Sequence, residues 1–574
     1  MNYVGMKLGL AALLICSGCT QPTTLNTAEK QTSQAQTVVT SLEQIDMAKW
    51  QYNEEDNVYY QIGIAYCSDP ADEEVETLAV FVPGDYMKAQ DNGDGTYTCT
   101  LNEEASIHGY TATSAPIVMP INTPGYSAQA ALTDYTDVSE YTDQGMVYVH
   151  AGCRGRESGA PAGVTDLKAA IRYLRYSDQT LAGDSEKIFV FGMSGGGAQS
   201  AVVAASGDSE LYDTYLEDIG AVQGVSDAVY GSMDWCPITS LDTADAAYEW
   251  MMGSTRSDLS EDLQAISDAL AQSYIDRINA YQFKDEDGNV LTLNEDGISG
   301  SYYDYVKEAI ETSLNEFLAN TQFPYTEAAQ TMGAMPEQMP EGQQPSGPMP
   351  STNDAQAMDG IQRSETQDSQ QESTTYESAQ DYINSLNANG QWITYDEQTN
   401  TASISSVEDF VSHCKQASKS LGAFDQLDEG QGENQLFAVD GSGGHFDETL
   451  ASVLSELDNE YAQDYKDDLA QTDWAGNDVQ TRVNMYSPLY YLSASSQGYQ
   501  TSTVAKYWRI RTGIEQGDTS LTTELNLALA LENYDEVKDV DFATIWGQGH
   551  TQAEQTGDAT SNFIEWIHTC MSEN

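Results

Sequence analysis

A serine enclosed by glycines is the residue of this sequence best suited to act as a nucleophile. Ser194 lies at the centre of Gly192-Met193-Ser194-Gly195-Gly196, a Gly-x-Ser-x-Gly match. In a tight turn between a strand and a helix, this motif holds the serine in a strained conformation that only glycine-sized neighbours allow. The hydroxyl is then exposed at the helix N-terminus, where the Gly195 N–H can face a developing oxyanion. We therefore predict that Ser194 is the nucleophile and that Gly195 is an oxyanion donor.

A serine nucleophile needs a base, and the base needs an acid to orient it. Of the six histidines, His550 lies in a glycine-bordered loop directly after a predicted strand, and Asp518 lies in the loop after the strand before it. The order Ser194, Asp518, His550 is the chain order of α/β-hydrolase triads. Glu515, in the same loop as Asp518, is the alternative orienting acid. The competing interpretations are an ordinary serine in a glycine-rich turn, a surface histidine, and an aspartate that caps a helix.

Further candidate residues come from two glycine-containing loops. The second oxyanion donor is expected after the strand predicted at 115–121, in Asn122-Thr123-Pro124-Gly125-Tyr126. The donor is the backbone N–H of Thr123 or Gly125, because Pro124 has none. Candidate substrate contacts are Tyr126, Glu515 and His445, the last of which follows a glycine-rich stretch further along the chain.

Alternating strands and helices are predicted around these residues. Ile188–Phe191 is an apolar run typical of a buried strand, and the small residues after Gly196 begin a helix. Further strands are predicted at 115–121, 145–150, 507–511 and 540–546, and further helices at 164–176 and 521–532. This alternation predicts a mostly parallel sheet flanked by helices, the α/β-hydrolase fold, with its site at the carboxyl ends of the strands.

The core is predicted in two parts, 43–240 and 483–574, separated by a large and mainly helical lid insertion at 241–482. Helices are expected at 257–283 with Ser257 as N-cap, and at 302–318, 407–421 and 446–469. Residues 328–375 are rich in Met, Pro, Gln, Gly and Ser, a composition that predicts disorder.

The first residues resemble a bacterial lipoprotein signal. Lys7 precedes a short apolar core, and Cys19 is the expected lipidated residue, so 1–19 is the predicted signal peptide and 20–42 a flexible tether. The alternative is an ordinary export signal. Either way the protein is expected to be exported, as a cell-surface or periplasmic lipoprotein of a bacterium with its lipid anchor at the outer surface of the membrane.

The chain of 574 residues carries 90 acidic and 23 basic side chains, a net charge of −67. Such a surface repels nucleic acid, which we exclude as a partner. The cysteines have no zinc-type spacing, and neither a metal nor a cofactor is expected. In an exported protein, some of the six cysteines beyond the signal are expected to form disulfides. The oligomeric state stays open.

The sequence resembles the bacterial tannase-like esterases, the subtype B tannase group of α/β-hydrolases. The resemblance rests on PIVMPINTPGYSA at 116–128, VYVHAGCRGR at 147–156, GVTDLKAAIRYLR at 163–175, FGMSGGGAQSA at 191–201, and GDTSLTTELNLALAL with WGQGH near the end. It implies Ser194, Asp518 and His550 as the triad and the insertion as a lid that shapes the acyl pocket. In this family two acidic residues after the penultimate strand serve the triad and the galloyl hydroxyls, and a lid lysine binds the galloyl group. Here that loop is Glu515-Gln516-Gly517-Asp518, with a different spacing.

Together these residues predict a secreted serine carboxylesterase that hydrolyses small esters, among them aromatic esters of the galloyl or feruloyl type. The partner is then a small-molecule ester. Two alternatives stay open at this point: a serine peptidase of the same fold, and a non-catalytic surface binding protein on a hydrolase scaffold.

Overall fold

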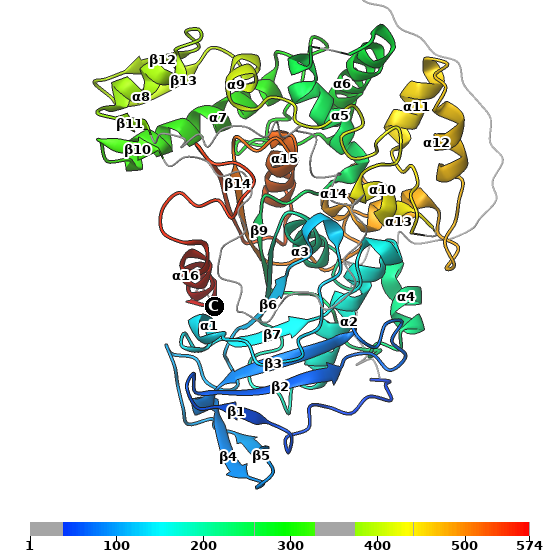
Figure 1. Ribbon diagram of the computed structural model, residues 1–574, viewed down its shortest axis with the longest axis vertical. Helices are drawn as coiled ribbons and strands as arrows, with labels where there is room; N and C mark the ends of the chain where they lie inside the picture. The colour runs from blue at the N-terminus through cyan, green and yellow to red at the C-terminus, as the bar shows by residue number, and fades with distance from the viewer. Residues whose placement is uncertain (1–37, 258, 328–373, 440, 573–574) are drawn as a thin grey trace, which may run out of the picture. The chain divides into compact units, whose positions relative to one another are not determined.

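Nine strands form the central sheet, in the order β1-β2-β3-β7-β6-β8-β9-β14-β15. The computed structural model describes residues 38–257, 259–327, 374–439 and 441–572 (Figure 1). The strands in spatial order are β1 (Gln51–Asn53), β2 (Val58–Ala65), β3 (Thr77–Pro83), β7 (Val147–Ala151), β6 (Ile117–Ile121), β8 (Ile188–Met193), β9 (Gly231–Trp235), β14 (Tyr507–Gly513) and β15 (Asp539–Ile545). Strands β1, β2, β3 and β7 pair antiparallel, and β7 through β15 pair parallel, which confirms the mostly parallel sheet.

Helices cover both faces of this sheet because alternate strand residues point to opposite sides. In β8, Ile188 and Val190 pack into the core with α2 (Ala162–Tyr176), α3 (Gly195–Ala205) and α15 (Leu521–Glu532). Phe189 and Phe191 point the other way, against α16 (Ala559–Ser572). The continuous apolar run that predicted a buried strand is therefore buried from both sides.

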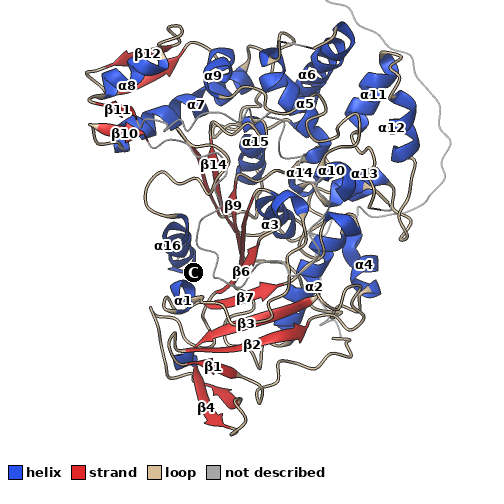
Figure 2. Ribbon diagram, viewed as in Figure 1, coloured by secondary structure: helices blue, strands red, loops and turns tan. Residues whose placement is uncertain are grey.

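The chain between β9 and β14, which contains the insertion expected at 241–482, consists mostly of helices in its described part (Figure 2). Its helices are α5 (Leu241–Met252), α6 (Glu261–Tyr281), α7 (Ser301–Asn320), α8 (Ala379–Leu386), α9 (Val407–Cys414), α10 (Gly432–Phe437), α11 (Glu448–Glu456), α12 (Ala462–Leu469), α13 (Val479–Met485) and α14 (Pro488–Leu492). Two short hairpins join them, β10 (Tyr325–Glu327) with β11 (Thr374–Tyr376) and β12 (Ile393–Asp396) with β13 (Thr401–Ile404). Residues Val38–Asn574 form one compact unit, so the insertion packs onto the core.

Three helix predictions in the insertion need correction. The N-cap of α6 is Ser260 rather than Ser257, because its side chain accepts the Leu263 N–H at 3.3 Å. The single helix predicted at 446–469 is two helices, since Asp458 has a φ of 50° after α11 ends. The helix predicted at 407–421 ends at Cys414, and the chain beyond it runs as a loop toward the carboxyl end of β14.

Several predictions concern residues outside the described ranges. They are the signal peptide with Cys19, most of the tether, and almost all of the tract at 328–375. In the part of the chain that the structure describes, no helix has the length and apolar character needed to cross a membrane. The six cysteines of that part are all free, so the expectation of disulfides among them is wrong: Cys67, Cys99, Cys153, Cys236, Cys414 and Cys570.

Candidate active site

Ser194 lies in the tight turn between β8 and α3 and has a φ of 60° and a ψ of −123°. This is a strained conformation for a residue with a side chain. The neighbouring glycines are required by close backbone approach, because a Cβ on Gly196 would lie 2.1 Å from the Ile121 carbonyl oxygen. The Ser194 N–H donates to the Trp235 carbonyl at 3.0 Å, which ties the turn to the end of β9. The strand–turn–helix context expected for a nucleophile is present.

The loop after β6 lies directly against Gly195. A Cβ on Gly195 would meet the Gly125 nitrogen at 3.0 Å and the Tyr126 nitrogen at 2.6 Å. The Tyr126 N–H is used within the loop, where it donates to the Thr123 carbonyl at 2.9 Å. Arg156 holds the loop from outside by donating to the Gly125 carbonyl at 2.8 Å. The two backbone segments predicted to supply oxyanion donors are thus adjacent.

His550 reaches the same end of the sheet from the loop after β15. Cys236, the residue after Trp235, donates its Sγ–H to the Thr551 carbonyl at 3.1 Å. Trp235 therefore binds the nucleophile turn while the next residue binds the histidine loop. Within the described ranges the Ser194 hydroxyl makes no hydrogen bond, so a direct Ser194–His550 contact stays a prediction.

The side chain that hydrogen-bonds His550 in the structure is Gln516, which was not among the predicted site residues. The His550 Nδ1 lies 2.6 Å from Oε1 of Gln516 but 3.8 Å from the nearest carboxylate oxygen of Asp518, beyond hydrogen-bond distance. The Asp518 side chain is 44% exposed, and Glu515 makes no hydrogen bond to the ring either. Neither Asp518 nor its alternative, Glu515, hydrogen-bonds the imidazole in this structure, and the orienting role expected for Asp518 stays a prediction.

The backbone explains why Gln516 takes this position. The loops after β14 and β15 are joined by the Glu515 N–H, which donates to the Gln548 carbonyl at 3.0 Å. A turn closes at the end of β14, where the Gln516 N–H donates to the Gly513 carbonyl at 3.2 Å. Gly513 permits the approach, since a Cβ there would lie 1.9 Å from the Gly549 carbonyl oxygen. The turn brings Gln516 under the imidazole and leaves Asp518 further out.

The amide of Gln516 is fixed by two acceptors. Its Nε2 donates to Glu524 Oε1 at 2.6 Å and to Thr512 Oγ1 at 2.7 Å. Because both N–H groups are occupied, the amide oxygen faces His550, whose Nδ1 must then carry the proton. The other ring nitrogen, Nε2, is left unprotonated, which is the tautomer that a general base requires.

Charged groups from the core and the insertion meet around this loop. Lys415, buried just after α9, donates its ammonium to the Gln516 carbonyl, and burial lowers its pKa to about 8 against the opposing effect of Glu524. Burial raises the pKa of Glu524 and of Glu515 to about 7, and Lys415 opposes both shifts. Burial also lowers the pKa of His550, which keeps the ring neutral and basic near neutral pH.

Two predicted substrate contacts are held inside the protein. The Tyr126 ring is 2% exposed, and its hydroxyl donates to the Ile238 carbonyl. His445 is equally buried, with Nδ1 at 2.8 Å from Asp425 and its ring 3.5 Å from the Tyr465 ring. The structure does not support contact of either side chain with substrate, because their polar atoms already have partners. Their roles are to hold the turn and the insertion.

One group of residues in the insertion has ligand atoms close enough together for a cation: Glu429, His445 and Asp468, within 4.8 Å of one another. The imidazole is already bonded to Asp425, and Asp468 accepts the His445 backbone N–H at 3.0 Å. These bonds explain the cluster without an ion, and we assign no metal to it.

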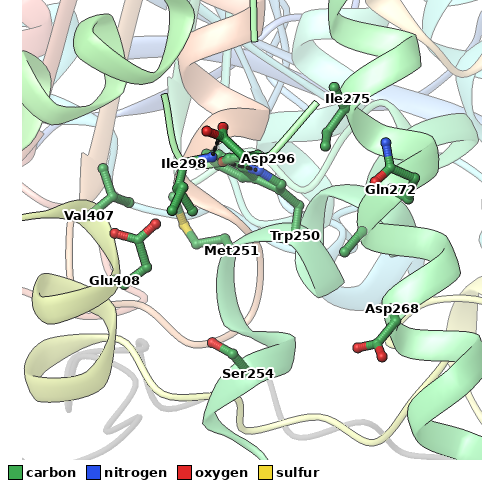
Figure 3. A pocket seen from close by; sticks show the side chains of 12 residues that line it. Trp250, Met251, Ser254, Asp268, Gln272, Ile275, Asp296, Ile298, Val407 and Glu408 are labelled. Atoms are coloured by element: carbon green, nitrogen blue, oxygen red, sulfur yellow. Dashed lines mark hydrogen bonds between the residues drawn. The ribbon is translucent and has the colours of Figure 1, made fainter. Parts of the chain in front are cut away.

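A cavity of about 280 Å³ lies elsewhere in the insertion (Figure 3). Trp250 and Met251 of α5, Ile275 of α6 and Glu408 of α9 line it. None of the residues discussed above reaches it, so it is separate from the Ser194 site.

A parallel sheet that carries a strained serine between β8 and α3, with a histidine loop after its last strand, defines an α/β-hydrolase. The family model BD-FAE matches residues 109–282, which contain the serine. A search of curated proteins found no match.

Solved structures extend the likeness over most of the chain. A tannase from Fusobacterium nucleatum is 26% identical, with a TM-score of 0.66 over 90% of this chain and 95% of its own. A tannin acyl hydrolase in complex with ethyl gallate is also 26% identical, with a TM-score of 0.62 over 89% and 94% of the two chains. The tannin acyl hydrolase of Lactobacillus plantarum, 24% identical over 92% and 98%, shows the same fold with a TM-score of 0.66. The chain is a tannase-like α/β-hydrolase, a carboxylesterase-type hydrolase.

Proposed function

We propose that the protein is a serine carboxylesterase that hydrolyses small aromatic esters through an acyl-enzyme. The observation that carries the proposal is the strained Ser194 turn, bound to the end of β9 beside the loop that presents a neutral His550. The aromatic substrate class is supported by tannin acyl hydrolases of similar structure that were solved with ethyl gallate and with 3,4-dihydroxybenzoate.

In the proposed reaction, Nε2 of His550 takes the Ser194 proton as the hydroxyl oxygen attacks the ester carbonyl. The backbone N–H groups of Gly195 and of the 123–125 loop stabilise the oxyanion that forms. Collapse of the tetrahedral intermediate expels the alcohol, which receives the proton from His550, and leaves an acyl-serine. Water, deprotonated by the same imidazole, then attacks the acyl group and releases the acid.

We further propose that Asp518 recognises a phenolic hydroxyl of the acyl group. Asp518 is half-exposed beside the imidazole and does not hydrogen-bond it, so its carboxylate is available to accept a hydrogen bond. The resemblance to tannases, in which an acidic residue of this loop binds the galloyl hydroxyls, supports the same role here.

Hydrolysis of methyl gallate, methyl ferulate and simple aryl acetates by the purified protein and by Ser194→Ala tests the proposal. We expect acid release from wild type and a loss of at least about a thousandfold in the variant. Equal background rates would refute it. Turnover of a peptide panel in place of esters would identify a peptidase, and binding without turnover would identify a binding protein.

We also propose that the protein is an exported lipoprotein, which rests on the sequence of residues 1–19. In the native host, Cys19→Ala should move the protein from the membrane fraction to the soluble fraction. Retention of the variant in the membrane would contradict the anchor.

A further inference from the structure

We propose that a neutral amide, that of Gln516, orients the catalytic imidazole in place of the usual carboxylate, and that the buried Glu524 positions this amide. The inference rests on the proposed function, because the imidazole concerned is the base of that reaction. Gln516 and Glu524 act through His550, so both are positioning residues.

The distances to Nδ1 of His550 favour Gln516 over Asp518. The imidazole Nδ1 is 2.6 Å from the Gln516 oxygen, a good hydrogen bond, and 3.8 Å from the Asp518 carboxylate, which is not one. The half-exposed Asp518 is also screened by water, whereas Gln516 is 1% exposed.

The Gln516 amide is also held in one orientation. A glutamine turned end over end would point its NH₂ at His550 and favour the wrong tautomer. Glu524 prevents this, since its oxygen accepts one amide N–H at 2.6 Å and accepts the Thr512 hydroxyl at 3.2 Å. Glu524 is fully buried in the first turn of α15, where the helix N-terminus favours a carboxylate. Its second oxygen, Oε2, is buried without a hydrogen bond, so Glu524 makes its hydrogen bonds through Oε1 alone.

The arrangement moves the negative charge one side chain away from the imidazole. The charged groups that face His550 are Asp518, which favours the imidazolium, and Lys419 and Lys415, which disfavour it. Glu524 in turn faces Lys415. With no carboxylate in contact with Nδ1, the ring stays neutral to lower pH than the base of an ordinary triad.

A charge exchange tests this directly. In Gln516→Glu/Glu524→Gln the shapes and the net charge are kept, but the carboxylate now contacts Nδ1 and the amide lies behind it. We expect the pKa of His550 to rise by about one pH unit or more, and the acidic limb of kcat/KM to move up with it. Titration of ¹³C-labelled histidine by NMR measures the pKa without using activity, and the signal lost in His550→Gln assigns it. An unchanged His550 pKa in the folded double variant would overturn the proposal.

Two single variants separate Gln516 from its competitor. Gln516→Met removes the acceptor without adding charge, and we expect kcat to fall at least about tenfold with KM little changed. Asp518→Asn should raise KM and change kcat less. The reverse pattern, with kcat lost only in Asp518→Asn, would return the orienting role to Asp518. If circular dichroism shows that the double variant does not fold, Gln516→Met and Asp518→Asn still test which residue orients His550.

Failure of this inference is distinguishable from failure of the proposed function. If Ser194→Ala keeps full esterase activity, the proposed function is wrong, while the NMR titration still reports what orients His550. If Ser194→Ala is inactive and the pKa of His550 is the same in wild type and in Gln516→Glu/Glu524→Gln, only the inference about Gln516 is wrong.

Discussion

Gly196→Ala should displace the Ser194 hydroxyl without removing any catalytic side chain. A Cβ at this position would lie 2.1 Å from the carbonyl oxygen of Ile121, and that carbonyl belongs to a sheet strand that cannot turn aside. An ordinary carbon–oxygen contact is about 3.4 Å, so α3 and β6 must separate by roughly 1 Å. Ser194 is two residues from the clash and moves with the helix.

The size of the effect follows from two terms. Overpacking of this kind costs about 1–3 kcal/mol of stability. A displacement of about 1 Å at a reacting group lowers the rate by about a hundredfold. We therefore expect kcat for an aryl ester to fall far more than the melting temperature.

Gly197→Ala is the matched control in the same helix. Its Cβ would meet the Trp235 carbonyl oxygen at 3.0 Å, a contact that a small shift relieves, and alanine is the better helix former. We expect kcat within about tenfold of wild type. If both variants lose the same activity, or if Gly196→Ala keeps wild-type kcat, the link between glycine spacing and nucleophile position is refuted.

Other predictions concern buried charges. Asp227→Asn should cost about 3–5 kcal/mol, read from the urea midpoint, because it leaves the buried Lys168 (Nζ–Oδ1 2.7 Å) without its anion; a change below about 1 kcal/mol would contradict this. Charge partners hold the pKa of Asp227 below its ordinary value against the effect of burial. The contribution of the Asp227 charge to the free energy of unfolding is therefore present above about pH 4 and should be lost as the pH falls further. Asp227→Asn should not show this loss. Burial raises the pKa of Glu515 to about 7, so the native state binds a proton that the unfolded state releases, and the free energy of unfolding should fall as pH rises from about 4.5 to 7. Glu515→Gln should reduce this dependence of stability on pH. An unchanged dependence would contradict the raised pKa of Glu515.

The elements that position the site were predictable because their signals are local. The helix expected at 521–532 is α15, Leu521–Glu532, and the strand expected at 540–546 is β15, Asp539–Ile545. Each is a sustained apolar pattern bounded by polar or turn residues, and burial on the sheet reinforces what the pattern favours. The Ser194 turn was predictable for the same reason, since a motif and both of its flanking elements lie within twenty residues.

The partner of His550 was not predictable, because it depends on how two loops meet. Glu515, Gln516 and Asp518 are neighbours in one short loop, and residue type alone favours the carboxylates. The hydrogen bond from the Glu515 backbone to Gln548 decides which side chain faces the ring, and no sequence pattern reports it. The trace in the sequence is Glu524, an acid in the first turn of a buried helix, whose burial requires a donor such as the Gln516 amide.

The insertion contributes charged and hydrogen-bonding groups to the loop after β14 that contains Gln516. Lys415 leaves α9 and donates to the Gln516 carbonyl, while Ser418 donates to the next carbonyl, that of Gly517, at 2.8 Å. Two lysines of the loop that follows α9, Lys415 and Lys419, disfavour a charged His550. Any movement of the loop at 415–419 would therefore change both the position of the Gln516 turn and the basicity of the imidazole. These bonds join the insertion to the core at the loop whose Gln516 side chain hydrogen-bonds His550.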